Sequence, residues 1–209
     1  MMYKKAFAAG FAVCLLFSLA NAQKAEATIS LNEAFFDSLL DSIFKNFDPP
    51  SFPVVETKSS GCDESIRILR EMNGVRTAVR FREGKIYLPL AFSGNYSPPF
   101  VGCVEFAGWA EANLELEYDQ EGQRLVGKAK VLSVHLNGAG GIGSSVMAKM
   151  IQGSIDKKLN PLELLTLDKI SFAVPIQKTG NLRMRATGVR PEIASGLVNI
   201  HIDYEFLKG

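Results

Sequence analysis

Glycines near the middle of the chain have a spacing that occurs in nucleotide-binding sites. The run Gly138-Ala139-Gly140-Gly141-Ile142-Gly143 fits the G-x-G-x-x-G pattern and falls between a strand-like and a helix-like segment. A dinucleotide site also requires a buried parallel strand and a βαβ series, whereas the preceding residues alternate as in a one-sided antiparallel strand. We therefore interpret the run as a flexible connection or a gate, because glycine lowers the cost of loop movement.

Side chains that could support hydrolysis or metal binding are few and scattered. The sequence has no G-x-S-x-G motif, and Ser144 and Ser145 lie at a predicted helix start, where serine is typical as a cap. His135 and His201 are the only histidines, and no motif assembles a Ser-His-acid triad. No cysteine or histidine cluster has the spacing of metal ligands. We expect no catalytic activity, no cofactor and no metal.

Charged side chains gather on the polar faces of the predicted strands. Four acidic residues share one strand face and oppose lysines of the return strand, which predicts cross-strand pairing on a solvated surface. They are Glu105, Glu111, Glu115 and Glu117, opposite Lys128 and Lys130. Two outward basic stretches hold Arg76, Arg80, Arg82, Arg183, Arg185 and Arg190. These arginines form either an ordinary charged surface or a patch for transient contact with an anionic membrane surface.

Two segments with helical periodicity must position these residues. The first is predicted over 31–47, opened by the capping box Ser30-Leu31-Asn32-Glu33 and ended by the prolines that follow Asp48. The second is predicted over 144–159 and is ended by Asn160-Pro161.

About seven segments with twofold alternation complete the chain. Residues 75–81 and 86–92 predict a hairpin around Glu83-Gly84-Lys85, with Pro89 marking an edge or a bulge. Residues 105–118 and 124–136 predict a second pair with a bulge near Val131-Leu132. The last three strands are expected over 170–176, 182–187 and 198–206. The pattern predicts an α+β fold in which two amphipathic helices cover a one-sided antiparallel sheet.

Residues 1–22 have the features of a secretory signal. Lys4 and Lys5 precede an apolar run of 14 residues, and Ala20-Asn21-Ala22 is a small-x-small cleavage site. The run is shorter than the ~20 residues of a membrane span, although an uncleaved anchor is the alternative. We expect an exported protein, periplasmic or extracellular, with residues 23–209 forming a single domain. Removal of the signal leaves 21 basic against 22 acidic residues, and this balance does not suggest nucleic-acid binding.

The exported part of the chain keeps two cysteines, Cys62 and Cys103. An even number of cysteines in an exported protein favours one disulfide. The bond would close a loop of about 40 residues and contribute up to ~4 kcal/mol in the chain-entropy model. The alternative is two free, buried thiols.

The first helix carries large apolar side chains over an unusually wide arc. At about 100° per residue they spread over roughly 200° of the helical wheel. They are Leu31, Phe35, Phe36, Leu39, Leu40, Ile43, Phe44 and Phe47. A surface helix needs a stripe only somewhat wider than ~100°. The arc must therefore be covered on more than one side, by a sheet that wraps it in a dense core, by a partner, or by a ligand with apolar tails.

The order of elements resembles the tubular lipid-binding (TULIP) superfamily, and most closely its small bacterial envelope members with one lipid-binding unit. The resemblance lies in the helix opening at 28–33, the proline-containing hairpin at 84–90, the second helix at 142–159 and the closing strand at 196–202. It implies a curved antiparallel sheet of about seven strands wrapped around the two helices. It also implies an apolar seam that holds phospholipid or another acylated molecule, without chemistry.

The leading hypothesis is an exported lipid-binding protein for envelope lipid carriage or assembly. Its acyl chains would lie between the two helices and inward strand residues. The expected lining is Phe35, Phe36, Leu39, Leu40, Ile43, Phe44, Phe47, Met147, Met150, Ile151, Ile155, Phe172, Val174, Ile200 and Ile202. One alternative is a non-catalytic envelope scaffold with a fully packed core that recruits partners at strand edges. A third is a hydrolase of acylated substrates.

Overall fold

A computed structural model describes residues 25–53, 62, 64–97, 100, 102–137, 143–177 and 180–209. The predicted signal at 1–22 and residues 138–142 of the glycine-rich run lie outside the described residues. The helices are α1 (Glu33–Asn46) and α2 (Ser144–Lys158), with a short 3-10 helix, η1 (Asp168–Ile170). No described helix is long and apolar enough to cross a membrane.

Thirteen strands are present among the described residues. The first six are β1 (Ala25–Asn32), β2 (Ser51–Pro53), β3 (Ser65–Leu69), β4 (Glu71–Met72), β5 (Val75–Arg76) and β6 (Arg80–Arg82). The next four are β7 (Lys85–Tyr96), β8 (Val104–Asp119), β9 (Arg124–Asn137) and β10 (Leu162–Thr166). The last three are β11 (Phe172–Ile176), β12 (Gly180–Ala194) and β13 (Leu197–Lys208).

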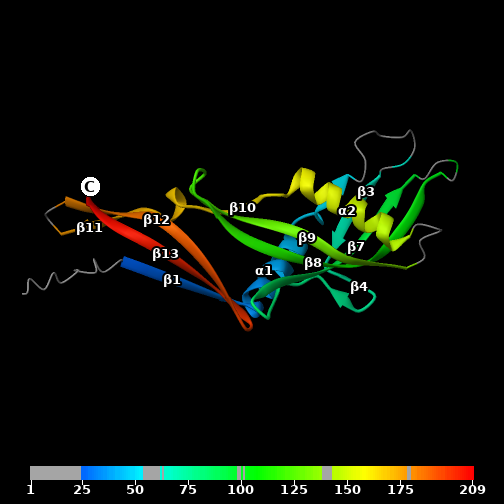
Figure 1. Cartoon of the computed structure of the whole chain (residues 1–209), viewed down its shortest axis with the longest axis horizontal. Coiled ribbons are helices and arrows are strands. Elements are labelled where there is room, and N and C mark those ends of the chain that lie inside the picture. Colours follow the sequence, from blue (N-terminus) through cyan, green and yellow to red (C-terminus); the bar gives the residue numbers. More distant parts are fainter. Residues whose placement is uncertain are drawn as a thin grey trace, which may run out of the picture.

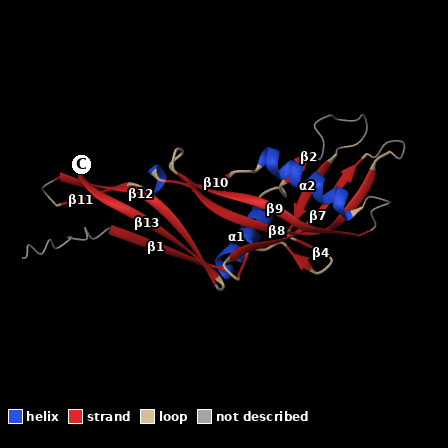
Figure 2. Cartoon of the chain, viewed as in Figure 1, coloured by secondary structure: helices blue, strands red, loops and turns tan. Residues whose placement is uncertain are grey.

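Eleven of these strands form two curled antiparallel sheets rather than one, and β4 and β5 form a separate two-stranded sheet. The four-stranded sheet has the order β1-β13-β12-β11, and the seven-stranded sheet has the order β10-β9-β8-β7-β3-β2 with β6 paired to β7. The sheets follow each other along the long axis, α1 lies near their junction, and α2 lies along β9 (Figures 1 and 2). The predicted antiparallel α+β class with two helices is thus confirmed. The expected single sheet of about seven strands is wrong.

The residues before α1 form a strand instead of a helix opening. Ala27, Ile29 and Leu31 alternate in β1 and pair with Ile202, Ile200 and Val198 of β13. α1 therefore begins at Glu33, capped by Asn32, whose side chain accepts a hydrogen bond from the Phe35 N–H at 2.9 Å. The predicted capping box at Ser30 is wrong. The alternation of the strand continues two residues beyond the point at which the helical pattern placed the start of the helix.

The first predicted hairpin is also divided differently. Asn73 and Gly74 have positive φ angles of 51° and 78°, which suits a tight turn joining β4 and β5. The continuous strand expected over 75–81 is therefore wrong, and only Arg80–Arg82 pairs with β7. The turn at Glu83-Gly84 is confirmed, with φ of 51° and 69°.

Two further predictions concern the long strands, and one of them is confirmed. Pro89 lies neither at a sheet edge nor at a bulge, since β7 is an interior strand that pairs with β8 in register there. It falls in the gap between two partners on the other side of β7, because β6 pairs up to Tyr87 and β3 begins at Ala91. The predicted bulge lies at Leu132, because Ala112 pairs with Val131 while the adjacent Glu111 pairs with Ser133.

Two apolar clusters and one disulfide hold the fold. One cluster joins the two sheets through Phe81, Ile86, Leu125, Val198 and Ile202, and a second joins α2 to the seven-stranded sheet. Cys62 and Cys103 are bonded, with their Cα atoms 5.4 Å apart, as predicted. The bond ties the segment before β3 to the start of β8, so it stabilises one end of the seven-stranded sheet.

Candidate functional site

A cavity of about 340 Å³ lies between α1, α2 and the inner face of the seven-stranded sheet. α1 contributes Leu40, Ile43 and Phe44, and α2 contributes Ile151 and Ile155. The sheet contributes alternate residues, as the twofold period requires. They are Ile66 and Ile68 of β3, Leu88, Leu90 and Phe92 of β7, Ala110 and Leu114 of β8, and Gly127 and Ala129 of β9.

Small residues line the cavity on β8 and β9. At Gly127 the surroundings are close, since a Cβ atom there would stand 2.9 Å from Leu114 Cδ1 and 3.3 Å from Leu164 Cδ1. Ala110 and Ala129 each contribute only a methyl group to the lining. The alternating pattern therefore produces an apolar face, and the small side chains at these two positions add little volume to it.

The polar side chains of the lining direct their hydrogen bonds to the protein. The Thr77 hydroxyl donates to Leu69 O at 2.5 Å and accepts from the Ala91 N–H at 3.0 Å. Ser154 Oγ donates to Pro53 O at 2.7 Å. Asn160 donates to Ala129 O and accepts from the Ala129 N–H, both at 2.8 Å. Because these groups are already paired, the interior offers an occupant mainly apolar contact.

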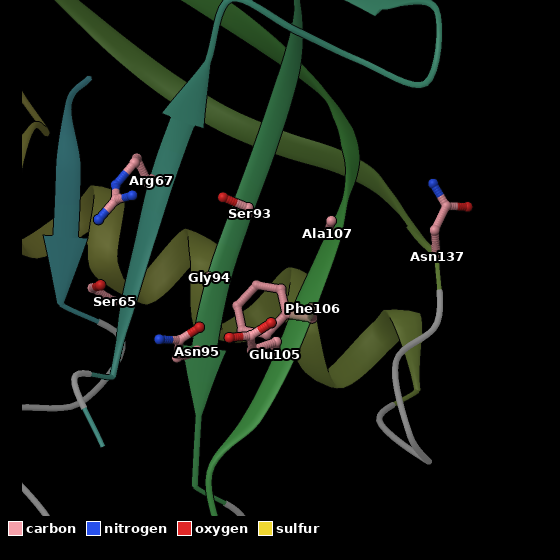
Figure 3. Close-up of a pocket in the computed structure, with 9 residues that line it drawn as sticks. All are labelled: Ser65, Arg67, Ser93, Gly94, Asn95, Glu105, Phe106, Ala107 and Asn137. Carbon is pink, nitrogen blue, oxygen red and sulfur yellow. The ribbon is translucent and has the colours of Figure 1, made fainter. Parts of the chain in front are cut away.

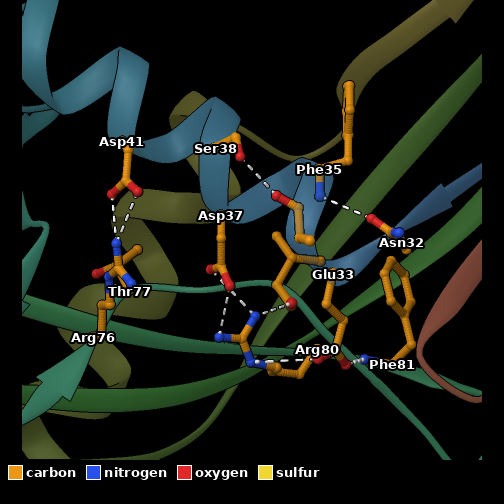
Figure 4. Close-up of polar contacts among 12 residues, drawn as sticks. Asn32, Glu33, Phe35, Asp37, Ser38, Asp41, Arg76, Thr77, Arg80 and Phe81 are labelled. Atoms are coloured by element: carbon orange, nitrogen blue, oxygen red, sulfur yellow. Dashed lines mark hydrogen bonds and ion pairs between the residues drawn. The ribbon is translucent and has the colours of Figure 1, made fainter.

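α1 covers the cavity although none of its residues is buried. Its attachment on one flank is electrostatic. Glu33, Asp37 and Asp41 follow each other at intervals of four residues, so they share one side of the helix. Three arginines from the β3–β6 region approach that side: Arg70, Arg76 and Arg80. Figure 4 shows the carboxylates of α1 pointing toward the strands below it.

The contacts of this acid–arginine cluster are short. Arg70 Nε and Arg76 Nη2 each lie 2.6 Å from Asp41 Oδ1, and Arg80 Nη2 lies 3.2 Å from Asp37 Oδ2. The hydrogen bond from Arg70, followed by that from Arg76, lowers the pKa of Asp41 below its ordinary value. The cluster therefore keeps Asp41 ionised and holds this flank of α1 against the sheet.

Apolar side chains are exposed beside the cavity. Phe35 and Leu39 are nearly half exposed on α1, and Phe47 just beyond it is 69% exposed. Leu162, which lines the cavity from the edge strand β10, is 42% exposed, as is Leu164. The cavity thus reaches a partly open apolar border at β10.

The structure brings five of the predicted lining residues together in the cavity, namely Leu40, Ile43, Phe44, Ile151 and Ile155. Phe36, Ile200 and Ile202 belong to the cluster at the sheet junction, and Met147 is fully buried in the other cluster. Phe35, Leu39, Phe47 and Phe172 are exposed, whereas Met150 and Val174 are half-buried outside the lining.

None of the sheet residues in the lining is among those predicted from the sequence. The alternation of Leu88, Leu90 and Phe92, and of Ala110 and Leu114, places each set on one face and was visible in the sequence. No sequence pattern indicates that the β7–β9 face, rather than the β11–β13 face, lies beneath both helices. β3, with Ile66 and Ile68, carries too short a pattern to have been recognised.

A second hollow lies on the outer face of the same sheet, with a volume of about 440 Å³. Figure 3 shows polar side chains from neighbouring strands around it, including Arg67, Asn95, Glu105 and Asn137. Its floor is made of small residues such as Ser93 and Ala107. It therefore lacks the apolar enclosure of the inner cavity.

The remaining charged and polar candidates are mainly paired. Lys128 Nζ lies 2.5 Å from Glu117 Oε2, which confirms cross-strand pairing at that position. Ser133 Oγ lies 3.1 Å from Glu111 Oε2 and 3.4 Å from His135 Nε2. The histidine is therefore not placed between serine and carboxylate, as a triad requires. Among the described residues, no group of three or more potential ligands could hold a metal ion.

The other predicted arginines lie on β6 and β12. Arg185 pairs with Glu205, and Arg190 lies 3.3 Å from Glu26. Comparison with known sequences adds no family to this geometry: no protein-family model matches the chain, and no curated protein matches it.

Proposed function

We propose that the chain is an exported lipid-binding protein that holds an acyl chain of a phospholipid or another acylated molecule in the inner cavity. The observation that carries this proposal is the 340 Å³ space with an apolar lining whose polar side chains are all internally paired. Transfer of an acyl chain from water into such a site is favourable, because it removes apolar surface from water. The TULIP resemblance points in the same direction.

The size of the cavity favours one acyl chain over two. Its volume is near the lower end of the ~300–1,000 Å³ range of small-molecule sites. A two-chain phospholipid would leave one chain outside, where Leu39, Leu162 and Leu164 offer exposed apolar surface. The Cys62–Cys103 disulfide agrees with an oxidising compartment and so supports export. Envelope lipid carriage or assembly is the role that fits these properties.

The proposal is tested on residues 23–209 by native mass spectrometry, before and after extraction with organic solvent. We expect bound acylated molecules in the first spectrum, and rebinding of an added single-chain lipid after extraction. Phe44→Asp should abolish rebinding, because it places a charge in the lining. Phe47→Asp is the matched control, since Phe47 is exposed on the same helix end and should leave binding intact. A ligand-free protein that ignores added lipid would contradict the proposal.

One observation favours the scaffold alternative as a second candidate. β1 is an edge strand of the four-stranded sheet, runs for eight residues and contains no proline. β11, at the other edge, carries Pro175, which interrupts the hydrogen-bonding potential of a strand. A partner strand would therefore be expected to add at β1. Strand addition at β1 would not exclude lipid binding, since β1 and the cavity belong to different sheets, whereas the fully packed core of the scaffold alternative would exclude it.

A further inference from the structure

We propose that Arg70, Arg76 and Arg80 form a site for the anionic head group of the ligand whose acyl chain fills the cavity. This inference rests on the proposed function and specifies the ligand as an anionic amphiphile. In the ligand-free arrangement the three arginines contact Glu33, Asp37 and Asp41 of α1. A phosphate or carboxylate head group would replace these side chains as the partner of the arginines.

The arginine site and the cavity share one boundary. Thr77 lines the cavity, and its backbone carbonyl accepts a hydrogen bond from the Arg70 guanidinium. Arg76 immediately precedes Thr77, and the Thr77 hydroxyl donates to Leu69 O, next to the lining residue Ile68. A ligand whose chain extends past Thr77 would therefore bring its head group to the arginines.

On α1, too, the residues that line the cavity lie next to the charged residues of the cluster. Leu40 and Phe44 line the cavity, whereas Asp37 and Asp41 lie on the adjacent flank of α1. One helix thus carries both the apolar cover of the cavity and the carboxylates that occupy the arginines. Head and chain of one ligand would contact both features together.

The carboxylates are well placed but exchangeable. The Asp41 side chain is 51% exposed and that of its partner Arg76 is 46% exposed. An ion pair this exposed contributes little, because water screens it and ordering the side chains costs entropy. The pair of Arg80 with Asp37 is less exposed, at 25% and 28%. A phosphate presents several oxygens to the planar guanidinium groups and forms bidentate, charge-assisted hydrogen bonds. Exchange of one anion for another keeps every arginine paired.

Exchange of anions would also loosen α1. The helix has no buried residue, and the acid–arginine contacts hold one flank of it in addition to the packing of Phe36 on Phe81. When a head group takes the arginines, Asp37 and Asp41 are free to turn toward water. Binding of the head group would thereby ease access of the chain to the cavity beneath the helix.

The test is isothermal titration calorimetry of residues 23–209 with three probes: myristoyl lysophosphatidylglycerol, monomyristoylglycerol and glycerol phosphate. The first two share the chain and differ in head-group charge, while the third lacks the chain. We expect the anionic lipid to bind roughly ten- to a hundredfold more tightly than the neutral lipid, as charged hydrogen bonds allow. Glycerol phosphate should bind far more weakly than the anionic lipid.

Variants of the cluster separate a head-group site from a merely structural one. The double variant Arg76→Gln/Arg80→Gln should lose the preference for the anionic over the neutral lipid. It should keep its affinity for monomyristoylglycerol, and this retained affinity also shows that the variant is folded. Asp41→Asn should increase the preference, because it removes the competing carboxylate from Arg70 and Arg76. A structural role would predict weaker binding of both lipids instead. Arg183→Gln, on β12, is the matched control and should change neither affinity.

Each contrary result has a distinct meaning. Equal affinity of the wild-type protein for the charged and neutral lipids would overturn the head-group site and leave the acyl cavity standing. Glycerol phosphate binding as tightly as the anionic lipid would overturn the link between arginines and cavity. No binding of either lipid by the wild-type protein would overturn the proposed function itself.

Discussion

The two sheets have similar apolar inner faces but are covered in different ways. Both helices lie over the seven-stranded sheet, and a cavity remains beneath them. The four-stranded sheet is packed near the junction, where Ile202 is 1% exposed, whereas Phe172, Ile176 and Phe206 are about half exposed toward its far end. An alternating pattern therefore specifies which face is apolar, but the helices decide whether that face becomes a core, a cavity or an open surface.

The two regions also differ in how they are held. The seven-stranded sheet has a disulfide and a helix attached by ion pairs, while the four-stranded sheet depends on long strand pairing and the shared apolar cluster. The following predictions test this difference.

The largest effect is expected from loss of the disulfide. A Cys62→Ser/Cys103→Ser double variant releases a loop closed across 41 residues and should lower the free energy of unfolding by about 2–5 kcal/mol. Hydrogen exchange should become faster in β3, β7 and β8 before it changes in β12 and β13. If hydrogen exchange became faster to the same extent in both sheets, this result would contradict the expected difference between the two regions.

A matched pair of isoleucine truncations compares core with cavity. Ile202→Ala, in the junction cluster, should cost about 2–5 kcal/mol of unfolding free energy. Ile68→Ala, in the cavity lining, should cost less than about 2 kcal/mol, because part of its surroundings is already empty. Denaturant unfolding measures both. Equal costs would indicate that the cavity is as densely packed as the junction.

A smaller, pH-dependent effect is expected at the acid–arginine cluster. The pKa of Asp41 is held below its ordinary value of 3.8 by hydrogen bonds from Arg70 and then Arg76. A carboxyl with a lowered folded-state pKa contributes stability above 3.8, and this contribution is lost as the pH falls through the folded-state pKa. Asp41→Asn should therefore lower Tm slightly at neutral pH and leave it unchanged in strong acid. If the difference in Tm between Asp41→Asn and the wild type were the same at every pH, the charge of Asp41 would be excluded as its cause.

The smallest effect is expected at the outer surface of β8 and β9. Lys128→Gln removes the pair with Glu117, but both side chains are largely exposed, so Tm should stay within experimental error. Calorimetry at low and high salt measures the Tm of the variant and of the wild type. A clear loss of stability would show that outer-face charges contribute more than the α1 cluster does.

Local patterns predicted much of the secondary structure. The long strands β8, β9 and β13, the Glu83-Gly84 turn, the bulge near Leu132 and α2 follow from alternation, turn residues and helical period. β1 was mistaken for the opening of α1, because Ser30 and Glu33 also fit a capping box. Tertiary pairing with β13 decided between these two local options.

The candidate site was predicted only on its helical side. Leu40, Ile43, Phe44, Ile151 and Ile155 were identified because helical period marks the apolar face. The sheet side was assigned to Ile200 and Ile202, which instead join the two sheets. Arg70 was missed as well, because its partner Asp41 lies 29 residues away and only the fold brings them together.

The most direct test of the account compares filling the cavity with an equal change outside it. Ala129→Phe adds a ring to the lining, whereas Ala107→Phe adds one to the outer face of the same sheet. Native mass spectrometry with myristoyl lysophosphatidylglycerol then counts bound lipid at matched concentrations. We predict one lipid per chain for the wild type and Ala107→Phe, and none for a folded Ala129→Phe. Equal lipid occupancy of the two variants would contradict binding in the inner cavity.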